Sequence, residues 1–92
     1  MNIHTNARFY TGFTSINSNI TPAVLGSSQK LRFGVTVLSQ SSNSQTIYVG
    51  NSGMTVSASG FPLSAGSAVD IPVDNINKVY LLGSGNISWL GA

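Results

Sequence analysis

The chain has 92 residues and a net charge of +2, carried by four Lys or Arg residues and two Asp residues, and it contains no cysteine. A chain of this length forms a single domain. Its cations are too few to neutralise a stretch of phosphates, no apolar run is long enough to cross a membrane, and disulfides and thiolate zinc sites are excluded. We therefore expect neither nucleic acid nor a membrane as a partner.

Uncharged polar residues dominate the composition. Ser, Thr, Asn and Gln make up 34 of the 92 residues, Gly adds ten, and Glu is absent. Long helices are rich in Glu, Lys, Arg and Ala, so this composition argues against a helical protein. A hydrophobic content of 41% with little net charge also argues against disorder. We expect a small all-β domain whose surface is covered by hydroxyl and amide groups.

The first 30 residues have the weakest pattern. Short apolar stretches over 7–10 and 23–25 could each form a strand, and the polar stretch 15–19 between them is typical of a turn. The clearest alternation follows over 30–37, where every second residue is apolar. It predicts a strand whose core-facing residues are Leu31, Phe33, Val35 and Val37. The polar stretch 39–45 predicts a surface loop.

The second half of the chain alternates between strand patterns and turn residues. The stretches that predict strands are 46–49, 54–58, 69–73, 78–82 and 87–90. The stretches that predict turns are 51–53, 64–67 and 83–86. Pro72 lacks a backbone donor, so we expect the strand that contains it at a sheet edge. About five strands at this spacing predict an antiparallel β-sandwich or barrel.

Groups that could perform catalysis are scarce. The chain has one histidine, His4, and two carboxylates, Asp70 and Asp74, which would lie about 13 Å apart on one face of a strand. Paired carboxylate chemistry needs a separation of roughly 5–10 Å. No serine stands in a Gly-x-Ser-x-Gly motif beside an activating base. We therefore expect no catalytic, metal-binding or cofactor-binding residues and no enzymatic activity.

Two groups of aromatic residues are candidates for binding a partner. Phe9, Tyr10 and Phe13 are close together near the start of the sequence. They pack either on the core of the domain or on another molecule. Tyr48 and Tyr80 lie opposite the β-branched residues of their predicted strands. They contribute either to cross-strand packing or to a platform for sugar rings.

Several short segments of strand and turn residues resemble a known pattern. They are Ile47-Tyr48-Val49-Gly50-Asn51, Met54-Thr55, Gly60-Phe61-Pro62-Leu63, Ala65-Gly66-Ser67 and Lys78-Val79-Tyr80-Leu81-Leu82-Gly83. From about residue 37 onward, the sequence resembles small virion proteins of tailed bacteriophages. Such proteins are poor in charge, lack cysteine and assemble as symmetric oligomers on a larger lattice.

The resemblance, which covers about half of the chain, implies a jelly-roll-like β-sandwich fold. We expect a single domain over 1–92, in which residues 1–13 form an extended N-terminal arm. It implies a capsid decoration (cement) protein on the capsid surface of the virion, which binds the major capsid protein and stabilises the head. The oligomer that we expect is a homotrimer. Because an arm is suited to clasp a neighbouring subunit, we expect Phe9, Tyr10 and Phe13 to contact the partner. Since charge is scarce, we expect docking to depend weakly on salt.

The alternative function is a sugar-binding β-sandwich on a phage tail or fibre. In that case Tyr48, Tyr80 and Trp89 would be the residues on which sugar rings stack. The same Trp89 would otherwise belong to the core or anchor an interface.

Overall fold

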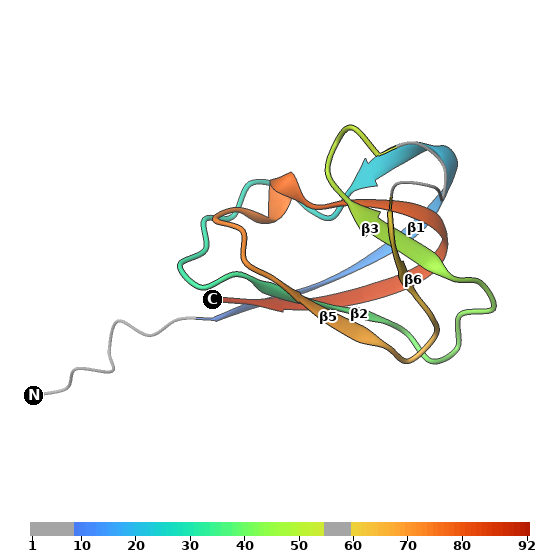
Figure 1. The fold of residues 1–92 in the computed structure, drawn as a ribbon. Coiled ribbons are helices and arrows are strands. Elements are labelled where there is room, and N and C mark those ends of the chain that lie inside the picture. Colours follow the sequence, from blue (N-terminus) through green and yellow to red (C-terminus); the bar gives the residue numbers. More distant parts are fainter. Residues whose placement is uncertain (1–8, 55–59) are drawn as a thin grey trace, which may run out of the picture.

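A computed structural model describes residues 9–54 and 60–92 of the chain. Over these residues the chain forms strands and one short 3-10 helix (Figure 1). The elements are β1 (Tyr10–Val24), β2 (Val35–Ser39), β3 (Ile47–Gly50), β4 (Phe61–Leu63), β5 (Ala68–Ile71), the 3-10 helix η3 (Ile76–Lys78) and β6 (Tyr80–Gly91). The prediction of an all-β domain is therefore confirmed.

The strand β6 is the centre of the sheet. One edge of β6 pairs with β1, and its other edge pairs with β3 near its start and with β2 near its end. The strand β4 pairs with β3, and β5 pairs with β2, so β4 and β5 are the outer strands of the two arms on that side of β6. All these pairs are antiparallel. The result is one curled antiparallel sheet with two arms, β3–β4 and β2–β5, that face each other (Figure 1).

The sheet curls because β6 bends at two glycines. Gly83 has φ 132° and Gly85 has φ 152°, a backbone conformation that side chains with a Cβ rarely adopt. The stretch 83–86, which the sequence predicted as a turn, is therefore a bend inside a continuous strand. The two strands predicted over 78–82 and 87–90 are both parts of β6. Residues that are typical of a turn form a bend here, because β1 pairs with β6 both before and after the stretch 83–86.

The side chain of Asn43 fills the gap between β2 and β3 beside this bend. Its Oδ1 accepts a hydrogen bond from the backbone N–H of Asn86 at 2.8 Å, and its Nδ2 donates to the Asn86 carbonyl at 2.9 Å. The Nδ2 group also lies 2.9 Å from Ser39 Oγ, which accepts a further hydrogen bond. The Asn43 amide thus pairs with β6 as a neighbouring strand would. The surface loop predicted over 39–45 is present beyond Ser39, but it has this structural role.

The core lies between the two arms and the concave face of β6. Its members are buried aliphatic residues, which alternate with more exposed residues along β2 and β3 and also come from the segments between the strands. They are Ile16, Leu25, Leu31, Val35, Val37, Ile47, Val49, Leu63, Ile76, Val79, Leu81 and Ile87. The predicted core residues Leu31, Val35 and Val37 are therefore confirmed.

Phe33 was also predicted in the core, but it is 79% exposed. The alternation fails because regular strand geometry begins only at Val35. Before that residue, the N–H groups of Arg32, Phe33 and Gly34 all donate to the carbonyl of Ala92. Three successive donors on one acceptor require a tight bend, and the bend turns Phe33 outward.

The long strand β1 corrects the prediction of a turn over 15–19. These polar residues continue the strand, because their side chains face solvent and bond to polar residues of β6. Ser15 Oγ donates to Asn86 Oδ1 at 2.7 Å, and Ser84 Oγ donates to Asn17 Oδ1 at 3.3 Å. Between them, Ile16 faces the core. The stretch is therefore an alternating strand with hydroxyl and amide groups on its outer side, and the prediction of a turn is wrong.

The remaining strand predictions were mixed. The strands over 46–49 and 69–73 correspond to β3 and β5. The short strand β4 was not predicted, since Pro62 suggested a break. The strand predicted over 54–58 falls almost entirely on residues 55–59, which lie outside the described part of the chain.

Candidate docking surface

The convex side of β1, β6, β2 and β5 forms a continuous surface that we call the outer face. Strand alternation and register place two rows of side chains there. One row is Phe13, Ser88, Leu38 and Ala68, and the other is Thr11, Leu90, Thr36 and Asp70. Phe13 is 62% exposed and Leu90 is 48% exposed. Large apolar side chains thus lie in solvent on a face that polar residues usually occupy.

Two shallow depressions occupy this face. The larger, of about 620 Å³, is lined by residues that include Phe13, Leu38 and Leu90. The second, of about 490 Å³, lies at the Phe33 end and shares Thr36 and Leu90 with the first. The Arg32 guanidinium lies 5.8 Å from the centroid of the Phe33 ring, which fits a cation–π contact. The outer face is therefore an apolar surface that ends in an exposed aromatic residue.

Few charges interrupt the outer face. Asp70 is the one carboxylate in the two rows, and it accepts a hydrogen bond from Thr36 Oγ1 at 2.5 Å. The hydroxyls of Thr11 and Ser88 lie among the apolar side chains, and the Ser88 hydroxyl accepts a hydrogen bond from Gln40 Nε2. Binding at this face would rest on apolar contact and neutral hydrogen bonds, because it offers almost no ionic partners.

The structure separates the three aromatic residues predicted as partner contacts. Phe13 lies on the outer face, and Phe9 just before β1 is 69% exposed. Tyr10 is half-buried and packs against the core, opposite Gly91. Residues 10–13 belong to β1 and pair with β6, so they are part of the sheet rather than of an extended arm. The rest of the predicted arm, except Phe9, lies outside the described residues.

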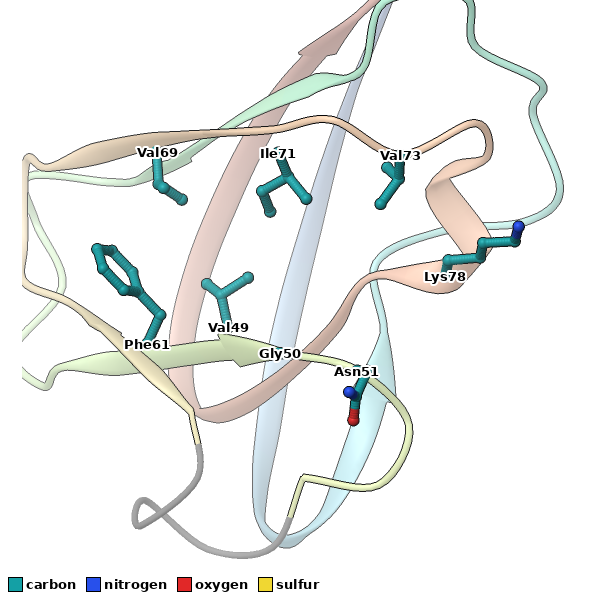
Figure 2. Close-up of a pocket in the computed structure, with 8 residues that line it drawn as sticks. All are labelled: Val49, Gly50, Asn51, Phe61, Val69, Ile71, Val73 and Lys78. Carbon is teal, nitrogen blue, oxygen red and sulfur yellow. The ribbon is translucent and has the colours of Figure 1, made fainter.

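An apolar pocket lies between the two arms of the sheet, away from the outer face. Figure 2 shows Val69, Ile71 and Val73 pointing from the β5 side towards Val49 and Phe61 of the β3–β4 arm. The pocket between them has a volume of about 280 Å³. It exists because β4 and β5 do not pair with each other, so the curled sheet is not closed along this seam.

Lys78 lies at one end of the seam (Figure 2). Its ammonium is 2.7 Å from Asp74 Oδ1, and both side chains are largely exposed. The hydrogen bond and charge of Lys78 hold the pKa of the Asp74 carboxyl below its ordinary value. This ion pair is a surface contact next to the apolar seam.

The aromatic residues proposed for sugar stacking lie on two different faces. Tyr48 pairs with Leu82, and Tyr80 pairs with Gly50, so the two tyrosines are diagonal neighbours on the side of β3 and β6 away from the core. Trp89 belongs to the opposite face of β6, where its ring covers Gly12 and packs against the core. The structure therefore brings Tyr48 and Tyr80 together but does not bring Trp89 to them.

The titratable residues form no cluster in the part of the chain that is described. There, no three His, Cys, Asp or Glu side chains gather where they could hold a metal ion. His4 lies outside the described residues. Within residues 9–54 and 60–92, no helix has the length and apolar character required to cross a membrane.

Sequence reasoning missed most of the outer face. Leu38, Leu90 and the exposed position of Phe33 were not recognised as candidate binding residues. Only the register of β1, β6 and β2 shows that Leu38 and Leu90 share the convex side with Phe13. The exposed position of Phe33 follows from the bend before β2. Comparisons with protein-family models, curated proteins and solved structures give no match to this chain.

Proposed function

We propose that this chain is a structural protein of the bacteriophage virion, namely a capsid decoration protein that binds the major capsid protein on the outer surface of the head and stabilises it. The finer fold that belongs to this proposal is the jelly-roll-like β-sandwich, with the two arms of the curled sheet as its two layers. The oligomeric state that belongs to this proposal is a trimer.

One observation carries this proposal, namely the exposed apolar outer face. A small monomer gains little from leaving Phe13, Phe33 and Leu90 in solvent, whereas a protein that docks on a larger surface uses such residues as contacts. A capsid lattice offers that surface many times over. The resemblance of the second half of the chain to phage virion proteins supports the same conclusion.

The test is co-sedimentation of the full chain with empty capsids of its own phage at two salt concentrations. We expect saturable pelleting at both, because the outer face is nearly uncharged and ionic screening has little to weaken. Leu90→Lys should abolish pelleting. Ser52→Lys, which adds the same charge at the exposed turn after β3, should leave it unchanged. Thermal unfolding followed by circular dichroism checks that both variants fold.

Two results would contradict this proposal. Pelleting that disappears at moderate salt would mean that ionic contacts dominate. A well-folded chain that stays in the supernatant at both salt concentrations would remove it from the head.

The alternative is sugar binding on a tail or fibre, and one observation favours it. Tyr48 and Tyr80 are diagonal neighbours on one face, which suits a stacking platform for a sugar ring. A glycan array on the full chain tests this function, with Tyr80→Ala as the variant that should lose any signal. An array without hits would argue against it.

A further inference from the structure

The strand β1 presents an unprotected edge. One edge pairs with β6 without interruption from Tyr10 to Ser18, and no strand in the described part of the chain pairs with the other. β1 has no charged residue, and its first proline is Pro22. Soluble proteins protect sheet edges with charges, prolines, bulges or short strands, since free backbone groups invite another strand. The first nine residues of β1 have none of these features.

The hydrogen-bonding pattern shows which groups lie on this edge. The N–H and C=O of Asn86 both bond away from β1, to Asn43 Oδ1 and to Gln40 N–H. Because these directions alternate along an antiparallel strand, Ile87 and Trp89 bond towards β1. Their partners in β1 are Thr14 and Gly12. Thr14 and Gly12 therefore direct their N–H and C=O groups towards β6. The alternate residues of β1 direct theirs to the free edge, and these residues are Thr11, Phe13 and Ser15.

The other sheet edges are protected. The strand β4 has three residues, one of which is Pro62. The strand β5 has four residues, includes Asp70 and is followed by Pro72. A second copy that approached β1 with either of these edges would bring a missing backbone donor or a charged carboxylate to the new pairing. The strand of a second copy whose edge can pair with β1 is therefore the β1 of that copy.

We propose that β1 pairs with β1 of a second copy, antiparallel and about a two-fold axis at Phe13. In this register the backbone of Phe13 forms two hydrogen bonds with its own counterpart, and Thr11 lies opposite Ser15. The same register places Tyr10 beside Ile16 on the inner side. All seven positions from 10 to 16 are uncharged, so no like charges meet. Aromatic and β-branched cross-strand pairs stabilise such joints.

The size of this joint sets its strength. Seven paired residues per copy are fewer than the roughly 20–30 residues a side of a standard stable interface. The dimer is therefore weak in dilute solution and forms where the local concentration is high. It joins the outer faces of two copies across the axis, with both Phe13 side chains at the centre. This two-fold interface is complete with two copies and does not by itself build the proposed trimer.

Sedimentation velocity of the full chain from about 1 µM to about 1 mM tests the proposal. We expect a monomer–dimer equilibrium within this range. Phe13→Lys places like charges opposite each other at the axis and should leave only monomer over the same range. Ala68→Lys, which adds the same charge on the protected strand β5, should leave the equilibrium unchanged. Since Phe13 and Ala68 are exposed, both variants should keep the unfolding temperature of the parent chain.

Single cysteines test the register in a chain that has none of its own. Across the axis, a directly opposed hydrogen-bonded pair has Cα atoms about 5.5 Å apart, which a disulfide can span. Phe13→Cys should therefore form a covalent dimer on oxidation. In Ser15→Cys the two thiols would be four residues out of register, roughly 14 Å along the strand, and should not cross-link.

Several results would overturn the proposal. They are a wild-type chain that stays monomeric to the highest concentration, a dimer or trimer that survives Phe13→Lys, and a dimer lost in Ala68→Lys. A cross-link in Ser15→Cys but not in Phe13→Cys would refute the register. None of these measurements uses a capsid, so the inference stands or falls separately from the proposed function.

Discussion

At the scale of single residues, the side chain of Asn43 takes the place of a strand beside β6. Its amide supplies the hydrogen bonds that a strand would otherwise make with the bend of β6. We expect Asn43→Ala to lower the free energy of unfolding by about 1–3 kcal/mol, because the Asn86 N–H loses its acceptor in a half-buried position. Urea unfolding measures this loss. Ser44→Ala, at an exposed residue of the same loop, is the control and should change it little. Equal stability of the two variants would show that water replaces the amide.

The ion pair of Asp74 with Lys78 is the second feature at this scale. Lys78 holds the pKa of the Asp74 carboxyl below its ordinary value, so Lys78→Met should raise that pKa towards it. A lowered pKa in the folded state adds stability above the unfolded-state pKa, and this contribution is lost as the pH falls through the folded-state value. The loss should be small, since both groups are exposed. Carboxyl chemical shifts followed by NMR against pH measure the shift, and Arg32→Met should not move it.

At the scale of elements, β6 depends on glycine at its bend. A Cβ at Gly83 would lie 3.1 Å from the Thr46 carbonyl oxygen, in a backbone conformation that favours glycine. We expect Gly83→Ala to cost about 1–3 kcal/mol of stability. Ser84→Ala, at the next residue, removes only an exposed hydrogen bond to Asn17 and should cost much less. Thermal or urea unfolding of both variants measures the difference. A tolerated Gly83→Ala would mean that β3 can shift away from the bend.

The elements also show how far the sequence predicts this fold. Alternation predicted β5 and the core residues Val35 and Val37 correctly, because there the period of the sequence matches a strand with one buried face. The β-branched and aromatic residues of 46–49 predicted β3 correctly. It failed for β1 and β6, where polar residues and glycines inside long strands were read as turns. Turns and bends inside a strand contain the same residue types. Which of the two forms depends on whether a neighbouring strand pairs with the segments on both sides. That pairing is a tertiary contact that no local pattern contains.

The candidate binding residues were harder to predict than the strands. The predicted partner contacts include Phe13, which lies on the outer face, and Tyr10, which packs on the core. It paired Tyr48 and Tyr80 with Trp89, which faces the other way. Which side chains share a face depends on register across β1, β6 and β2, and one residue of slip reverses every side chain.

At the scale of the whole molecule, the outer face and the β1 edge are adjacent, with Phe13 belonging to both. A Leu90→Lys variant should therefore lose capsid binding but keep the weak dimer, because Leu90 lies on the outer face but not on the free edge. Co-sedimentation and sedimentation velocity on the same preparation measure the two properties. Loss of both together would mean that one surface serves both contacts.

The central position of β6 has a consequence for how the protein is made. Among the described residues, each arm pairs with the rest of the sheet only through β6, and β6 follows the other described strands in the sequence. During synthesis, β1 and both arms therefore cannot pair with β6 until residues 80–91 have left the ribosome. Contacts between such distant parts of the sequence slow folding. Until then, the unpaired strands β1, β2 and β3 are exposed to chaperones and to neighbouring nascent chains.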